Sequence, residues 1–214
     1  MNMDFISSVV AGTVAVVSNI GMEAEVGVNR YDIQPDGTWY QKAFPHEIKK
    51  TSTMFSIGLN GPLGDTLQWH AGYVNLGRIH SDAMVTDEIG SHRYNPFSKN
   101  GCSHGRCKMV RAVGDGYTHG LMLSVDNDRK DHKGFVAGAG MFIGKSKWKV
   151  HALTERADWQ MEHKAPLSVA PMVRFGYAFG NGSTVSYMYI HHNSDRDFSA
   201  LQRGSHVVSY RYQF

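Results

Sequence analysis

The sequence has no apolar run long enough for a membrane-spanning helix. Such a helix needs roughly 18 or more consecutive apolar residues, and no stretch of the 214 residues reaches that length. The mean hydropathy is negative, which excludes a helical membrane protein. A membrane β-barrel remains compatible with this value, because half of the residues in its strands face the interior.

Strong charge of either sign is also absent. The net charge is +3, and charged residues make up 19% of the chain, somewhat below the usual quarter. This balance gives no argument for a nucleic-acid partner. The chain has no P-loop and no GxGxxG segment after a strand, so it lacks the common nucleotide-binding signatures. No cofactor is expected.

Cysteine is scarce, and the two residues present, Cys102 and Cys107, stand close together. A small disulfide loop formed in an oxidising compartment is the favoured prediction. A metal site made by these two residues and His104 is an alternative, but it has no distant fourth ligand. Free thiols are the third alternative. The other histidines show no metal-ligand spacing, and we expect no metal.

Glycine and aromatic residues are plentiful, with 23 Gly, 10 Tyr and 10 Phe. Glycine suits the crowded interior of a small barrel, and aromatic residues suit its interfaces. The last residues alternate between two faces, one with Val208, Tyr210, Tyr212 and Phe214 and the other with Ser209, Arg211 and Gln213. A side-chain period of two is typical of a strand whose faces meet different environments.

Alternation and turn residues together predict eight strands. Their approximate ranges are 24–33, 51–61, 66–80, 114–126, 134–145, 166–180, 183–194 and 205–214. Residues 147–156 are also compatible with an extended segment. Asn181-Gly182 separates the sixth and seventh strands and favours a two-residue hairpin turn.

The connections between these strands alternate between long and short. The long ones are 34–50, 81–113, 146–165 and 195–204, and the short ones are 61–65, 127–133 and 181–182. All long connections therefore fall at one end, as in outer-membrane barrels. We predict an all-β fold: an eight-stranded antiparallel membrane β-barrel with short periplasmic turns and long outer loops. A soluble β-sandwich or lipocalin-like carrier is the alternative.

The N-terminal segment is uncharged, small and apolar from Phe5 to Ile20. A signal peptide needs such a segment, but it also needs a basic leader, and Asp4 stands in that place. Residues 1–22 are therefore interpreted as a signal-like segment or an N-terminal tail. Residues 23–214 are expected to form a single barrel domain.

Eight strands leave an interior filled by side chains, without an open channel. Such a barrel must act through its outer loops or through its lipid-facing wall. Basic residues in the segment 81–113 would favour phosphorylated lipopolysaccharide as a partner.

A polar cluster follows the seventh strand at the long-loop end. It contains His191, His192 and Ser194, followed by Asp195 and Asp197. A base, a nucleophile and a group that orients the imidazole are what acyl hydrolysis requires. Because His192 and Ser194 are two positions apart, they would project from the same face of an extended strand.

The stretch from Arg174 to Ser194, with its Asn-Gly turn and its His-His-Asn-Ser sequence, resembles the lipid A 3-O-deacylase family of PagL type. Those proteins are eight-stranded outer-membrane barrels in which a His-x-Ser-Asn segment on the seventh strand carries a lipid-facing esterase site. The terminal Phe214, preceded by aromatics at alternate positions, also resembles outer-membrane barrels. The resemblance implies the outer membrane of a Gram-negative bacterium as the location, and lipid A or lipopolysaccharide in its outer leaflet as the substrate.

Two alignments to the family motif remain open. One implies His192 as the base and Ser194 as the nucleophile. The other has no gap after the turn and places the family histidine on His191, which agrees with the alternation along the strand. In that alignment Ser194 reaches the lipid face only if the chain bulges near Asn193.

The supporting groups of this site are less well defined. Asn193 or backbone N–H groups would stabilise the oxyanion. The family has its acid at the start of the eighth strand, where this chain has His206 and no carboxylate, so Asp195 or Asp197 would substitute. A different class of function is a non-catalytic barrel that binds, adheres or blocks a receptor through its long surface loops. No oligomeric state is predicted.

Overall fold

The computed structural model describes residues 20–33, 48–49, 51–88, 107–153, 158–164, 167–192 and 202–214. Across these residues the structure contains no helix that is long and apolar enough to cross a membrane. The strands are β1 (Gly21–Ile33), β2 (Ile48–Lys49), β3 (Thr51–Leu63), β4 (Leu67–Glu88), β5 (Cys107–Asp126), β6 (Lys133–Leu153), β7 (Asp158–Lys164), β8 (Ser168–Phe179), β9 (Ser183–His191) and β10 (Gln202–Gln213).

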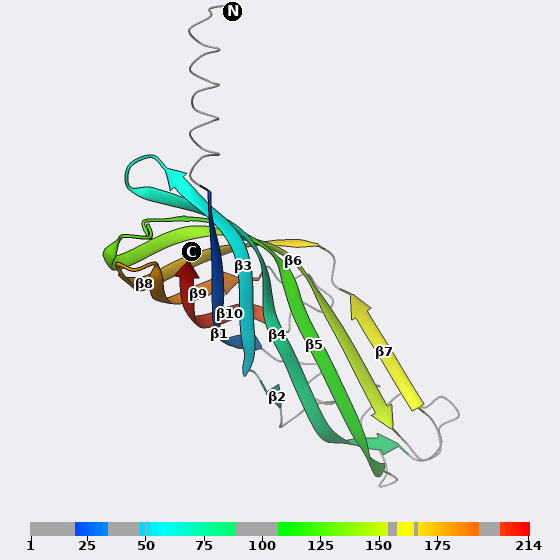
Figure 1. Cartoon of the computed structure of the whole chain (residues 1–214). Coiled ribbons are helices and arrows are strands. Elements are labelled where there is room, and N and C mark those ends of the chain that lie inside the picture. The colour runs from blue at the N-terminus through cyan, green and yellow to red at the C-terminus, as the bar shows by residue number, and fades with distance from the viewer. Residues whose placement is uncertain are drawn as a thin grey trace, which may run out of the picture.

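Eight of these strands close into an antiparallel barrel (Figure 1). The order around the barrel is β1, β3, β4, β5, β6, β8, β9 and β10, and β10 pairs with β1 to complete the circle. Closure gives each edge strand a partner, which a lipid environment requires because lipid cannot bond to free backbone N–H and C=O groups. The predicted eight-stranded antiparallel barrel is confirmed.

The short turns lie together at one end of the barrel, and the C-terminus lies at that end too (Figure 1). The turn between β8 and β9 was predicted as the two residues Asn181-Gly182, but it contains three residues. Gly180 and Gly182 both have positive φ, 79° and 80° respectively, a conformation that glycine adopts without steric cost. Asn181 Oδ1 accepts a hydrogen bond from the Ser183 amide at 3.1 Å, which closes the turn.

At the opposite end, β4 and β5 run further than predicted. The segment 81–113 was expected to be a loop, yet β4 continues to Glu88, which pairs with Cys107 at the start of β5. Strand β6 likewise includes residues 147–153, and the short β7 pairs with this extension. Outside the bilayer both faces of a strand meet water, so these segments need no apolar alternation. The segments 81–88 and 107–113 therefore showed no strand pattern, whereas residues 147–156 were recognised as compatible with an extended segment, and β6 confirms this as far as Leu153.

The outer wall of the barrel is apolar over the middle of the strands. Its exposed side chains include Val26, Val28, Phe55, Ile57, Leu59, Leu121, Leu123, Phe135, Met141, Val169, Val173, Phe175, Val185 and Val208. Aromatic pairs border this belt near the short turns, where the rings of Tyr177 and Phe179 lie 5.5 Å apart and those of Tyr212 and Phe214 lie 5.1 Å apart. An apolar band with aromatic girdles is the surface that a membrane barrel presents to lipid.

Candidate functional site

Strand β9 carries two different sets of side chains. The buried set, facing the lumen, is Thr184, Ser186, Met188 and Ile190. The set on the outer wall is Val185, Tyr187, Tyr189 and His191. The nine residues of β9 rise ~30 Å along the strand, which a tilt of about 40° reduces to ~23 Å along the barrel axis. Since an apolar belt is about 25 Å tall, His191 stands at its outer edge.

His191 belongs to a cluster of four rings on the outer wall, Tyr187, Tyr189, His191 and His206, which we call the histidine–tyrosine cluster. His191 Nδ1 lies 3.3 Å from the Tyr189 hydroxyl oxygen. His206 pairs with Tyr189 across β9 and β10. Its Nδ1 lies 2.7 Å from the Tyr187 hydroxyl, and its ring centre is 4.9 Å from that of Tyr189. The cluster therefore places two imidazoles on an amphipathic aromatic surface.

His192 lies on the opposite side of the wall from His191. It is 8% exposed, and its Nε2 lies 3.1 Å from the hydroxyl oxygen of Ser205, which is fully buried. The ring also packs edge-on against Phe142 at 5.9 Å. His192 therefore forms part of the packed barrel interior, and only His191 of this pair faces lipid.

Ser194, Asn193, Asp195 and Asp197 lie outside the residues that the structure describes. The structure therefore does not show which predicted nucleophile, oxyanion donor or acid approaches His191. Cys102 lies outside the described residues as well, so the Cys102–Cys107 disulfide stays a prediction. The hydrogen-bonding contacts of Tyr187 with His206 and of Tyr189 with His191 were not predicted from the sequence.

Comparisons with known proteins agree with the barrel geometry. No family model matches the chain, and no curated protein sequence matches it. The structure of Ail, the attachment invasion locus protein of Yersinia pestis, aligns with a TM-score of 0.53 and 10% identity, over 92% of this chain and 99% of Ail. Ail in complex with the heparin analogue sucrose octasulfate aligns with a TM-score of 0.51, also at 10% identity and with the same coverage of both chains.

The N-terminal β-barrel domain of Pseudomonas aeruginosa OprF aligns with a TM-score of 0.43 and 7% identity, over 91% of this chain and 97% of that domain. The chain has the fold of an outer-membrane β-barrel. At these identities the likeness concerns the fold alone. The comparisons do not show membership of the PagL-type family.

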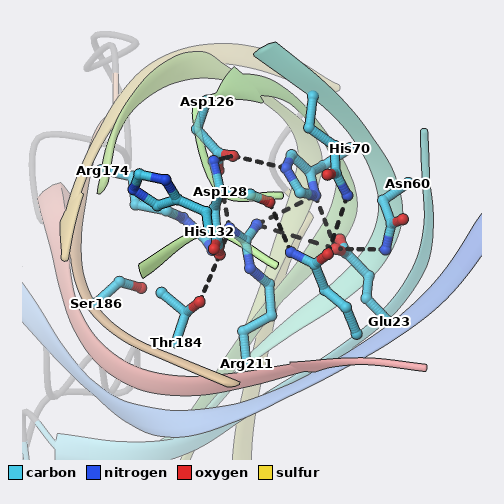
Figure 2. Close-up of polar contacts among 12 residues, drawn as sticks. Glu23, Asn60, His70, Asp126, Asp128, His132, Arg174, Thr184, Ser186 and Arg211 are labelled. Carbon is cyan, nitrogen blue, oxygen red and sulfur yellow. Dashed lines mark hydrogen bonds and ion pairs between the residues drawn. The ribbon is translucent and has the colours of Figure 1, made fainter. Parts of the chain in front are cut away.

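Inside the barrel lies a charged network that sequence analysis did not anticipate (Figure 2). Its centre is Arg211, which is fully buried. One guanidinium nitrogen, Nη2, lies 2.9 Å from Asp126 Oδ2 and 2.5 Å from Asp128 Oδ2. The imidazole of His70 bridges Glu23, at 2.7 Å from Nδ1, and Asp126, at 2.8 Å from Nε2.

A second buried ion pair joins the opposite walls of the lumen. Arg174 Nη2 donates to Glu25 Oε2 at 2.9 Å, and Ser209 Oγ donates to Glu25 Oε1 at 2.5 Å. Burial makes each unpaired charge costly, and each of these carboxylates contacts a guanidinium or imidazole group. Together these side chains fill the lumen at this level, as expected for eight strands. In the sequence, polar residues at alternate positions, such as Glu23 and Glu25, were the pattern that could have indicated this network.

No group of three or more His, Cys, Asp or Glu side chains within the described residues is arranged to hold a metal ion. The histidine–tyrosine cluster itself offers the chemistry of imidazole and phenol groups. Imidazole transfers protons near neutral pH, and phenol hydroxyls donate or accept hydrogen bonds.

Proposed function

We propose that this chain is an esterase of the Gram-negative outer membrane that removes an ester-linked acyl chain from lipid A. His191 acts as the base and Ser194 as the nucleophile. The observation that supports this most directly is the position of His191 on the outer wall, at the edge of the apolar belt, three residues before Ser194. The ester bonds of a bilayer lipid lie at this level, between its acyl chains and its headgroup.

The contact between His191 and Tyr189 supports a role for this imidazole in proton transfer. When Nδ1–H donates to the Tyr189 hydroxyl, Nε2 carries a free lone pair and can accept a proton. Tyr189 then takes the orienting place that a carboxylate has in a serine–histidine–aspartate triad. Asp195 or Asp197 remains the proposed acid that stabilises the imidazolium form.

The proposed reaction proceeds through an acyl-enzyme. Ser194 Oγ attacks the ester carbonyl carbon while His191 Nε2 accepts the hydroxyl proton. Asn193 or backbone N–H groups stabilise the oxyanion. The intermediate collapses as the carbon–oxygen bond to the lipid A sugar breaks, and the sugar oxygen takes the proton from His191. Water then attacks the acyl-serine by the same route and releases a free fatty acid.

Ser194→Ala is expected to abolish deacylation, because alanine has no oxygen to form the acyl-enzyme. Mass spectrometry of lipid A from Gram-negative cells that express either protein measures this directly. The wild-type sample should contain lipid A lighter by one acyl chain, and the variant sample should contain only the original species. Equal amounts of folded barrel in both membranes are the control. Identical lipid A profiles from the two strains would refute the proposal.

A second candidate function is favoured by the outer hairpin formed by β4 and β5, which projects beyond β9 and β10 (Figure 1). Its pairing continues from Gln68 and Asp126 as far as Glu88 and Cys107. Exposed hairpins of this length are suited to binding a partner by their loops and edges. The likeness in fold to an attachment invasion locus protein supports a non-catalytic role in adhesion.

This alternative predicts that shortening the hairpin removes function while the barrel still forms. Ser81 and Gly114 pair across the two strands, so residues 82–113 can be replaced by Asn-Gly, a two-residue hairpin turn. Adhesion of expressing cells to host cells or matrix should fall to the level of cells without the protein. Unchanged adhesion by the shortened barrel would exclude this role, and lipid A analysis of the same strain tests the esterase separately.

A further inference from the structure

We propose a second lipid site on the outer wall, formed by β4, β5 and β6, that binds the phosphorylated headgroup of an outer-leaflet glycolipid. It consists of the pocket lined by Arg78, Lys147 and Lys149, together with Lys145 on the same face of β6, and we call it the basic wall site. Strand β3 also lines the pocket, and the site is separated from the histidine–tyrosine cluster by β8 on one side of the barrel and by β1 on the other. Its existence does not depend on the proposed esterase activity.

The lysines of β6 share one face of that strand. Lys145, Lys147 and Lys149 occupy alternate positions and therefore project from the same side as Phe135 and Met141, which are exposed on the apolar wall. Lys145 stands ten positions after Phe135, or ~33 Å along the strand and about 25 Å along a tilted barrel axis. The lysine row thus begins where the apolar belt ends, at the level of lipid headgroups.

Strand β4 adds Arg78 to this surface. In the register of the sheet, Arg78 pairs with Tyr117, and Tyr117 pairs with Lys147. The Arg78 side chain is 70% exposed and is held by Asp115, with Nε 3.0 Å from Oδ1 and Nη2 2.9 Å from Oδ2. His80 Nδ1 also lies 2.9 Å from Asp115 Oδ1. This fixes the guanidinium group on the wall, where its outer edge remains accessible.

A concave pocket of about 550 Å³ lies between these side chains, lined by Phe55, Arg78, Asp115, Tyr117, Lys147 and Lys149 among others. It forms where the register of β4 shifts between Asn75 and Arg78. Gly77 takes a φ of +89° there, and a Cβ atom at this position would collide with the Thr53 carbonyl and the Ser52 side chain. The bulge therefore requires glycine, and it bends the wall into a hollow.

The composition of the surface indicates what occupies it. Beside the pocket, the rings of Phe55, Tyr73 and His119 form a chain with centroids 6.2 and 6.0 Å apart. A ligand at this height has acyl chains against the apolar belt and a headgroup among the cations. Charge complementarity makes that headgroup anionic, and Lys and Arg side chains bind phosphate through charge-assisted hydrogen bonds.

The excess of positive charge persists when neighbouring acids are included. Asp115 faces Arg78 and His80, and Glu162 of β7 stands opposite Lys149 in the register, while Lys164 stands opposite Lys147. Lys147 and Lys149 also interact within the protein. The site therefore depends on the net charge of the row and not on unpaired lysines.

The triple variant Lys145→Gln, Lys147→Gln, Lys149→Gln is expected to lose most of this binding. Each basic residue near an anionic membrane surface contributes about fivefold in affinity, so the loss should approach 100-fold. Native mass spectrometry of the refolded full-length barrel, in detergent micelles doped with bisphosphorylated lipid A, measures the fraction carrying lipid. The wild-type barrel should bind this lipid and should retain little dephosphorylated lipid A.

The matched control removes three charges at the other end of the barrel: Arg129→Gln, Lys130→Gln, Lys133→Gln. It should bind bisphosphorylated lipid A as the wild type does. Equal binding by the wild type and the β6 triple variant, or equal binding of phosphorylated and dephosphorylated lipid A, would overturn the proposal. Displacement of the lipid by millimolar inorganic phosphate would also overturn it, since the pocket would then be a small-anion site. The comparison is between phosphorylated and dephosphorylated lipid A, so its result does not depend on whether the protein cleaves acyl chains.

Discussion

Replacing His191 by alanine is expected to lower the rate of lipid A deacylation by about 10²- to 10⁴-fold, the usual contribution of a general base. The same replacement at His192 should leave the deacylation rate essentially unchanged. The two histidines are adjacent in sequence, but His191 is exposed on the lipid face and His192 is buried against Phe142 and Ser205. Release of fatty acid from lipid A by the refolded barrel, at equal concentrations of folded protein, measures both rates.

The two variants control for each other, because they make the same chemical change one residue apart. His192→Ala removes a buried side chain and leaves the Ser205 hydroxyl without its imidazole partner. We therefore expect the free energy of unfolding to fall by about 1–3 kcal/mol. If this prevents folding, His192→Gln keeps a polar group in the lumen and serves as the second comparison. Full activity in His191→Ala, or equal loss in both variants, would contradict the assignment of the base.

Arg211→Met is expected to destabilise the barrel by about 3–5 kcal/mol, the usual cost of removing one partner from a buried ion-pair set. Methionine fills much of the same volume, but it leaves Asp126 and Asp128 facing each other in the lumen without the guanidinium group. Urea unfolding of the barrel in lipid vesicles, followed by tryptophan fluorescence, measures the free energy of unfolding.

Two further variants test the cause of this loss. Adding Asp126→Asn and Asp128→Asn to Arg211→Met removes the two carboxylate charges that have lost the guanidinium group. This triple variant should recover part of the stability. Arg30→Met changes an exposed arginine on β1 and should alter stability by about 0.5 kcal/mol or less. Equal unfolding energies for Arg211→Met and the wild type would show that the network adds little to barrel stability.

Most of the barrel was predictable from the sequence because lipid and lumen impose opposite demands on alternate residues. Val208, Tyr210 and Tyr212 on one face, against Ser209 and Arg211 on the other, identify β10 without reference to any other strand. The outer parts of β4 and β5 were not predictable in this way, and for the outer part of β6 the sequence gave only an extended segment as an option. They lie beyond the belt, where pairing with a neighbouring strand holds the extended conformation and no pattern of hydrophobicity is required.

The candidate site was predictable in kind, and its orientation was predictable only from the alternation along the strand, because the family motif fitted two alignments. The residue types at 191–197 indicated acyl chemistry, yet both alignments of the histidines were compatible with the sequence. A shift of one residue exchanges the two faces of a strand, and the structure selects the register that the alternation favoured, with His191 exposed on the outer wall and His192 buried. The hydrogen bonds from Tyr187 and Tyr189 follow from the same register.

The sequence by itself determined that this chain forms a closed barrel, because its alternation, its lack of long apolar runs and its sorted connections allow few other folds. The tertiary structure alone decided which polar groups meet. Glu23, His70, Asp126 and Arg211 come from four strands spread across the chain, and barrel closure brings them to one level of the lumen. The basic wall site has the same origin, because strand register sets Arg78 beside residues of β5 and β6.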